Sequence, residues 1–192
     1  NRNTIIVVPS ANAALSPKYV KEIEKFFNTA DLILLQLEIP METVEFTVQL
    51  AKKYNVKIGL YAAPAKKLSE EILQDVSFIV AKSSELETIF GTGAKDEILH
   101  RFPNKLFIRD DDNSTTYFDG TEMKYLRNHG KATQCTMGMG DAFVSGYSIA
   151  MCHQNSTEEC VKFGNEISLK VSEQRGSQKG LPYLKEMKGL IS

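Results

Sequence analysis

The sequence lacks both an excess of charge of one sign and a long apolar run. Its 192 residues carry 23 basic and 24 acidic side chains, so the formal charge is −1. A protein without a net field of one sign has no long-range attraction for nucleic acid or for an anionic membrane surface. No apolar run approaches the roughly 18 residues that a membrane span needs. We therefore expect neither nucleic acid nor a membrane as a partner.

Cysteine is also scarce. Cys135, Cys152 and Cys160 are the three cysteines, and none belongs to a C-x-x-C pair. An odd number without that spacing argues against a disulfide framework and against a zinc site. A reducing compartment fits this usage, and we expect the cytoplasm. Position 1 is Asn rather than Met and an apolar run begins almost at once, so we expect a truncated or processed N-terminus.

What the sequence does contain is a series of short apolar runs separated by helical patterns. Runs rich in Val, Ile and Leu predict strands that are buried on both faces of a parallel sheet. Right-handed crossovers between such strands place helices on both faces. We predict one α/β domain over residues 1–192, a three-layer α-β-α sandwich with a mostly parallel sheet. The predicted strands are Thr4–Val8, Asp31–Leu37, Val56–Ala62, Ser77–Ala81 and Lys105–Arg109.

Helix signals mark the segments between these runs. Ser16 is a predicted N-cap before Pro17, which suits the first helical position. Apolar residues recur at helical spacing over residues 41–54. Ser84 and Glu87 have the spacing of a capping box, which predicts another helix start.

The pattern changes after residue 110. A short strand ending at Phe118, the turn Asp119-Gly120 and a second short strand predict a β-hairpin. Two helices are then expected to close the chain, at 141–152 and 157–174. Ser156 and Glu159 predict a capping box for the second of them.

The stretch TMGMGDAFVSG, residues 136–146, sets a glycine-rich turn before an apolar helix. Gly138 and Gly140 can take positive φ, and the first helical turn presents unpaired N–H groups, so Gly138, Met139 and Gly140 form a candidate anion hole. A carboxylate there repels phosphate. Asp141 is therefore a candidate general base that takes the proton of an attacking hydroxyl group. The alternative is an ordinary turn in which Asp141 is only the N-cap.

Other stretches accompany this turn. VVPSANAALSP near the start, LLQLEIP after the second predicted strand, APA after the third and RGSQKGLP near the end stand in the order and approximate spacing of a ribokinase-like carbohydrate kinase. Over nearly its whole length, the chain resembles the C-terminal portion of this pfkB-type family. The resemblance implies the ribokinase-like fold, without the N-terminal strands and the small β-lid of the family.

The family motif D-T-x-G-A-G-D implies roles within the glycine turn. Asp141 matches the base that deprotonates the hydroxymethyl group of the sugar for in-line attack on ATP. Cys135 stands where the family has its first aspartate, which orders the loop and helps to hold a monovalent cation. A neutral thiol serves neither purpose well, so the resemblance gives little support for a monovalent cation. Met137 and Met139 replace smaller residues, and the bulk of Met139 could crowd a phosphate group.

After the fourth predicted strand the family has N-x-x-E, whose glutamate acts through Mg²⁺ and water near the phosphates. The stretch KSSE keeps Glu85 and puts Lys82 in place of the asparagine. Lys82 either contacts a nucleotide phosphate or pairs with Glu85. The nucleotide turn of the family, T-x-G-x-x-G, reads RDDDNS here and has no glycine. Its three adjacent aspartates would repel a triphosphate unless a cation intervened.

Three further positions are candidates for contact with sugar or nucleotide. Glu38 matches the glutamate that ribokinase-like enzymes present to sugar hydroxyl groups, or it is only an acid before the helix that follows Pro40. Arg109 ends the fifth predicted strand and joins Lys82 as a candidate for nucleotide binding. Asn165 falls where the family has Asn or His beside the nucleotide base, and an ordinary polar helix residue stays open as its alternative.

These residues lead to competing functions. The first is a kinase that uses ATP and Mg²⁺ to phosphorylate a hydroxymethyl group of a pentose or a related sugar or nucleoside. The second is a kinase relative with impaired catalysis that acts as a binding or regulatory protein, since Cys135, Lys82 and RDDDNS alter the handling of phosphate. In a third, the chain is part of a larger kinase and works once further strands complete its sheet. A homodimer stays open as the oligomeric state.

Overall fold

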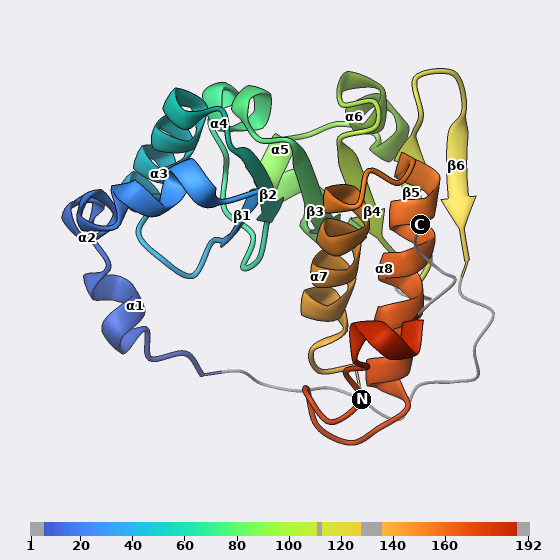
Figure 1. Cartoon of the computed structure of the whole chain (residues 1–192). Helices are drawn as coiled ribbons and strands as arrows, with labels where there is room; N and C mark the ends of the chain where they lie inside the picture. Colours follow the sequence, from blue (N-terminus) through green and yellow to red (C-terminus); the bar gives the residue numbers. More distant parts are fainter. Residues whose placement is uncertain (1–5, 111–112, 128–135, 188–192) are drawn as a thin grey trace.

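The computed structural model describes residues 6–110, 113–127 and 136–187 of the chain. This part contains a six-stranded sheet in the order β1-β2-β3-β4-β5-β6 (Figure 1). Neighbours among the first four strands are parallel, whereas β4 with β5 and β5 with β6 are antiparallel pairs. The strands are β1 (Leu32–Gln36), β2 (Lys57–Tyr61), β3 (Phe78–Lys82), β4 (Leu106–Arg109), β5 (Thr115–Phe118) and β6 (Met123–Leu126).

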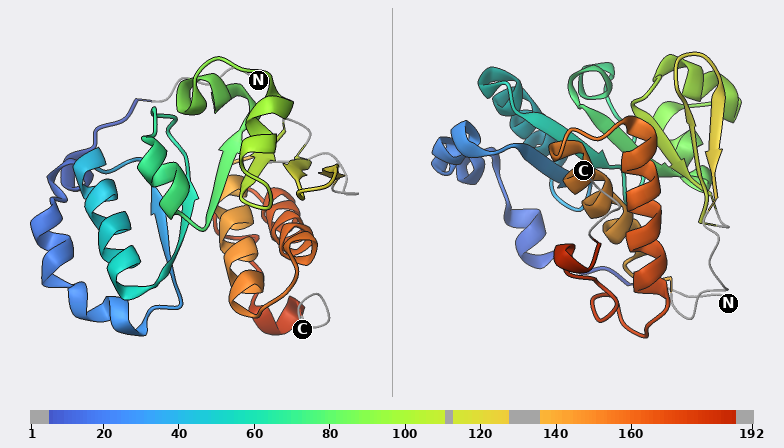
Figure 2. Two further views of the ribbon diagram at one scale, coloured as in Figure 1. Left: turned by 90° about the horizontal axis from the view of Figure 1, so that it is seen from above. Right: turned by 45° about the vertical axis from the view of Figure 1, so that its right-hand side comes forward.

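Helices lie against both faces of the sheet, which confirms the predicted three-layer arrangement (Figure 2). One face packs against α3 (Met41–Tyr54), α4 (Glu70–Asp75), α5 (Leu86–Phe90) and α6 (Lys95–Arg101). The other packs against α7 (Met139–Cys152) and α8 (Thr157–Ser172). The shorter elements are α1 (Ser10–Ala14), α2 (Pro17–Glu22), η1 (Glu24–Thr29), η2 (Ser83–Glu85) and η3 (Leu184–Met187). No helix among the described residues has the length and apolar character to cross a bilayer.

Side chains of the central strands alternate between two apolar cores. Ile58 and Leu60 of β2 pack toward α3, α4, α5 and α6, whereas Tyr61 packs toward α7 and α8. In β3, Ile79 joins the first core and Phe78 joins the second. Successive residues of a strand point to opposite faces. Because both faces are covered, successive residues are apolar, and this is the pattern that the sequence shows.

Most predicted elements are confirmed, but the first predicted strand is not. Thr4 and Ile5 lie outside the described residues, and Ile6, Val7 and Val8 adopt no regular structure. Their side chains are 88%, 69% and 77% exposed. An apolar run forms a strand only where a neighbouring strand satisfies its backbone groups, and the described residues provide none here.

The predicted capping box at Ser84 and Glu87 is also wrong. The chain turns directly from β3 into η2, and the carboxylate of Glu85 accepts a hydrogen bond of 3.3 Å from the main-chain nitrogen of Lys82. The helical turn therefore begins two residues earlier than predicted. The box at Ser156 is confirmed, since Ser156 and Glu159 exchange main-chain to side-chain hydrogen bonds of 2.8 and 3.3 Å.

Candidate active site

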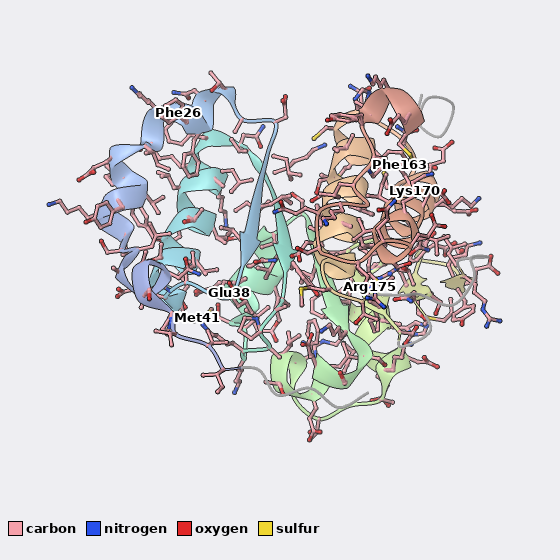
Figure 3. All side chains as sticks on the ribbon, turned by 90° about the horizontal axis from the view of Figure 1, so that it is seen from below. Phe26, Glu38, Met41, Phe163, Lys170 and Arg175 are labelled. Carbon is pink, nitrogen blue, oxygen red and sulfur yellow. The ribbon has the colours of Figure 1, made fainter. Side chains whose placement is uncertain are left out.

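The carboxyl ends of the parallel strands meet the start of α7 at one edge of the sheet. In such sheets, loops and helix N-termini converge at this edge, and ligands bind there. Figure 3 labels one residue on each side of this region: Glu38, which follows β1, and Arg175, which follows α8. Asp141, Gly140, Lys82 and Arg109, which line two cavities at this edge, therefore lie in one region.

The glycine turn fixes how α7 begins. Gly138 is the N-cap of α7 with a φ of 81°, and a Cβ atom on it would lie 2.7 Å from the carbonyl oxygen of Ser177. A Cβ atom on Gly140 would lie 2.2 Å from Oη of Tyr61. Gly138 is needed for its left-handed backbone and close neighbour, and Gly140 for the close approach of Tyr61.

Several main-chain donors of this turn have no acceptor among the described residues. The nitrogen of Met139 donates to the carbonyl of Thr136 over 3.4 Å, and that of Ala142 donates to the carbonyl of Gly138 over 2.9 Å. The amides of Gly140 and Asp141 have no hydrogen-bond acceptor among the described residues. Both lie at the positive end of a 14-residue helix, where an anion is favoured. Within the predicted anion hole, Gly138 and Gly140 thus have amides without an acceptor among the described residues, and Asp141 adds another.

The carboxylate of Asp141 faces the end of β1. Nε2 of Gln36 donates to its Oδ1 over 2.7 Å, although the two residues are 105 positions apart in the sequence. Oδ2 has no hydrogen bond with a described residue. Gln36 and Asp141 line a cavity of about 250 Å³ together with Tyr61, Val144 and Ser145, which we name cavity A. The carboxylate of Asp141, the predicted base, is therefore held in position by Gln36 and borders a cavity in which an attacking alcohol could bind.

A second cavity of about 360 Å³, cavity B, lies at the ends of β3 and β4. Its lining includes Tyr61, Lys82, Asp110, Met139 and Gly140. The ammonium group of Lys82 forms no ion pair with a described residue, so the predicted alternative of pairing with Glu85 is not observed. Cavity B therefore has a cation in its wall whose charge is available to an anion.

The charge of Asp110 in the wall of cavity B is compensated. Nζ of Lys95 lies 2.6 Å from its Oδ1, and Oγ1 of Thr116 donates to its Oδ2 over 2.6 Å. The expected repulsion between this aspartate and a triphosphate is weakened because both oxygens have partners. The next two residues of the RDDDNS stretch, Asp111 and Asp112, lie outside the described residues.

Arg109 and Asn165, both predicted to bind nucleotide, bind each other. Nη1 of Arg109 donates to Oδ1 of Asn165 and, over 2.8 Å, to Oγ1 of Thr115, while its Nη2 donates to Oγ of Ser168 over 3.1 Å. The guanidinium carbon lies 4.4 Å from the ring centroid of Phe143. Arg109 is 7% exposed and Asn165 is 3% exposed. These contacts join β4 and β5 to α7 and α8, with Arg109 also bordering cavity B.

Tyr61 lines both cavities and, like Gln36, is a site residue that sequence reasoning misses. It is the last residue of β2 and is 8% exposed. Burial, reinforced by the negative charges of Asp141 and Glu85 and opposed by Arg109, raises the pKa of Tyr61 to about 12. Its hydroxyl group therefore keeps its proton at neutral pH. The available signal was its position at the carboxyl end of a parallel strand, immediately before the stretch AAPA.

The remaining predicted residues lie at different depths. Glu38 is exposed beyond the end of β1 and does not line cavity A. Met139 is 4% exposed and lines cavity B, so its bulk is placed to limit the space for a phosphate group, whereas Met137 is 66% exposed. Cys135, the predicted replacement of the first motif aspartate, lies outside the described residues.

Comparison with known proteins places this geometry in a family. The family model described as pfkB family carbohydrate kinase matches residues 1–184. The chain is 27% identical over 190 residues to the ribokinase of Bacillus subtilis, covering 99% of this chain and 65% of the relative. It is 28% identical over 195 residues to the ribokinase of Haemophilus influenzae, covering 97% and 64%. The chain thus spans slightly less than two thirds of the length of these relatives.

Solved structures agree with this assignment at the level of the fold. The ribokinase of Thermotoga maritima superposes with a TM-score of 0.83 at 24% identity, over 98% of this chain and 65% of the other. The ribokinase of Arabidopsis thaliana, solved in complex with ribose and ATP, superposes with a TM-score of 0.85 at 21% identity over the same shares. The described part of the chain therefore has the ribokinase-like fold that the sequence predicts.

Proposed function

Because the chain belongs to the pfkB family of carbohydrate kinases, we propose that it transfers the γ-phosphate of ATP to a hydroxymethyl group of a pentose or a related sugar or nucleoside. The similar proteins support this substrate class, since they are named ribokinases and one was solved with ribose and ATP. ATP would supply the phosphoryl group, and Mg²⁺ would offset the charge of the phosphates.

One observation carries the proposal: a carboxylate and open main-chain donors share one helix start. Asp141 takes the proton of the attacking hydroxyl group through Oδ2, while the hydrogen bond from Gln36 to Oδ1 keeps the carboxylate facing cavity A. The amides of Gly140 and Asp141 donate to the oxygens on which negative charge develops. A positioned base contributes roughly 10²- to 10⁴-fold in rate.

The charged residues around cavity B suit the nucleotide. Lys82 offers its ammonium group to a phosphate, as a point charge. Glu85 is the carboxylate that would hold Mg²⁺ through water. Mg²⁺ is usually bound by one or two carboxylates together with substrate phosphates and water, so a single carboxylate fits this ion. The described residues contain no cluster of three His, Cys, Asp or Glu that could hold a metal without substrate.

The sugar would bind at cavity A and extend toward Glu38. A carboxylate accepts hydrogen bonds from hydroxyl groups strongly because it is charged. Glu38 follows β1 two residues after Gln36, so one short segment provides both the group that orients the base and an acceptor for the sugar.

The proposal is tested by titrating the full chain with ATP in a calorimeter, with and without Mg²⁺, and by a coupled assay over ribose, fructose and adenosine. Asp141→Asn should lower kcat by at least about 100-fold and should leave nucleotide binding in place. The matched control is Asp75→Asn, whose carboxylate lies on α4 and pairs with Lys52 at 2.8 Å. The control should keep the wild-type kcat, and an unchanged rate in Asp141→Asn would remove Asp141 from the mechanism.

The hydrogen bond between Arg109 and Asn165 favours a second function, that of a binding or regulatory protein. Because these side chains bind each other inside the protein, two of the groups expected to contact nucleotide are occupied. A binding or regulatory relative would take up sugar in the calorimeter without forming product from any of the three acceptors. Turnover of one acceptor would exclude this alternative.

A further inference from the structure

Tyr61 is shared by the walls of the two cavities. Tyr61 lines both cavity A and cavity B. Its Oη lies so close to Gly140 that a Cβ atom there would be 2.2 Å away. The amides of Gly140 and of its neighbour Asp141 have no acceptor among the described residues. One side-chain donor and two main-chain donors therefore belong to residues that line the two cavities and lie close together.

This hydroxyl group has no hydrogen-bond partner among the described residues. The side chain is 8% exposed, yet its oxygen is not sealed off, because no fully buried side-chain oxygen or nitrogen of the described part lacks a partner. A largely buried tyrosine usually finds a partner for its hydroxyl group. An unengaged donor that reaches a cavity is thus directed at a molecule that occupies the cavity.

The character of that molecule follows from the surrounding groups. At neutral pH the hydroxyl group is protonated and can donate, and the two amides can only donate. Lys82 adds a positive charge in the wall of cavity B. Three neighbouring donors and a cation are complementary to an oxyanion with several acceptor oxygens, and a phosphoryl group has this chemistry.

We propose that Tyr61 is a catalytic residue that donates a hydrogen bond to an oxygen of the phosphoryl group during its passage from cavity B to cavity A. This inference rests on the proposed kinase function. In the step, the acceptor oxygen forms a bond to phosphorus, and the bond from phosphorus to the leaving oxygen of ADP breaks. The proton of the acceptor hydroxyl group goes to Asp141, and Tyr61 keeps its own proton throughout.

Tyr61→Phe tests the contact because it removes the hydroxyl group and keeps the ring. Loss of a donor to developing negative charge in an active site costs a large factor in rate. We expect kcat to fall at least about tenfold while the KM of the sugar changes less than about twofold. The matched control is Tyr147→Phe, a tyrosine that is 3% exposed on α7 and packs against Phe78 and Phe107. It should keep the wild-type kcat, and an unchanged kcat in Tyr61→Phe would overturn the proposal.

Two binding measurements provide readouts other than activity. ADP with Mg²⁺, aluminium fluoride and ribose imitates the transferring state, whereas ADP with Mg²⁺ alone lacks the phosphoryl group. Tyr61→Phe should weaken the first complex at least about tenfold and the second less than about twofold. Equal weakening of both, or of neither, would show that the hydroxyl group does not contact the transferring group.

A third measurement separates this inference from the kinase proposal. Inorganic phosphate is titrated into wild-type protein labelled with ¹³C at Cζ of tyrosine, and the signal of Tyr61 is assigned from its loss in Tyr61→Phe. A saturable shift of that signal, absent for Tyr147, supports the contact even if no sugar is phosphorylated, in which case only the kinase proposal fails. No shift, together with unchanged kinetics or no turnover, would overturn the role of Tyr61.

Discussion

Replacing Arg109 by Met decides whether its guanidinium group stabilises the fold or binds nucleotide. The group donates to Thr115, Asn165 and Ser168 and lies over the ring of Phe143. A hydrogen bond that involves a charged group contributes about 1.5–3 kcal/mol, and such contributions are not additive within one cluster. Removing the guanidinium group also leaves the buried oxygens of its neutral partners without this donor, at roughly 1–3 kcal/mol for an unsatisfied group, so we expect a loss of about 4 kcal/mol for the whole cluster. The free energy of unfolding of a domain is about 5–15 kcal/mol in total. The loss expected for Arg109→Met is therefore a large share of the stability of the protein.

Urea unfolding followed by circular dichroism measures this loss. With a slope of about 2 kcal/mol per molar, the midpoint of Arg109→Met should fall by about 2 M. The control is Arg101→Met, since Arg101 is exposed and pairs with Glu70 at 3.0 Å on the surface. A pair of this kind contributes roughly 0–1 kcal/mol, so the midpoint of the control should fall by no more than about 0.5 M.

The same variants are titrated with ATP and Mg²⁺ at a temperature at which both are folded. If Arg109 acts through the fold, Arg109→Met binds nucleotide with an affinity close to that of the wild type. A midpoint equal to that of the control, combined with lost nucleotide binding, would refute the structural assignment. That result would return Arg109 to the nucleotide role that the sequence predicts.

Two further predictions concern stability. Gly164→Ala should lower the urea midpoint, because the new Cβ atom would lie 2.8 Å from the carbonyl oxygen of Phe143. Overpacking of this kind costs about 1–3 kcal/mol. The control is Gly93→Ala, which should keep or raise the midpoint because the nearest atom to its new Cβ would lie 3.5 Å away. Hydrogen bonds from Lys21, Lys53 and Tyr54 lower the pKa of Glu24 from 4.5 to about 2. The stabilisation by Glu24 is therefore complete above about pH 4.5 and is lost as the pH falls toward 2. Glu24→Gln should flatten the decline of the urea midpoint across that window, and Glu22→Gln should not.

The sequence predicts elements whose cause is local. The apolar runs that became β2 to β4 are continuous because both faces of the sheet are covered there. The box of Ser156 and Glu159 is confirmed because both partners lie within one helical turn. Ile6–Val8 has the same local pattern as the other runs and forms no strand, because pairing depends on a neighbour that a local pattern does not specify.

The candidate site likewise contains residues that a local pattern identifies and contacts that it does not. Asp141 and its glycines are recognisable because they are adjacent in the sequence and the helix start gives them a chemical meaning. The contact from Gln36 to Asp141 joins residues 105 positions apart. A resemblance to a family likewise assigns a position but not a contact: Arg109 and Asn165 occupy the expected places and yet satisfy each other.

Tyr61, which lines both cavities, limits which residue can stand at position 140 even before any ligand binds. A group that moved between the two cavities would pass the residue that both share, and that residue is Tyr61. Tyr61 can lie there only because residue 140 has no side chain, since a Cβ atom would be 2.2 Å from its hydroxyl oxygen. The close approach of Tyr61 thus requires glycine at position 140, whether or not a phosphate binds there. If that is correct, Gly140→Ala must displace Tyr61, and its effects on transfer should reproduce those of Tyr61→Phe and add the cost of the clash.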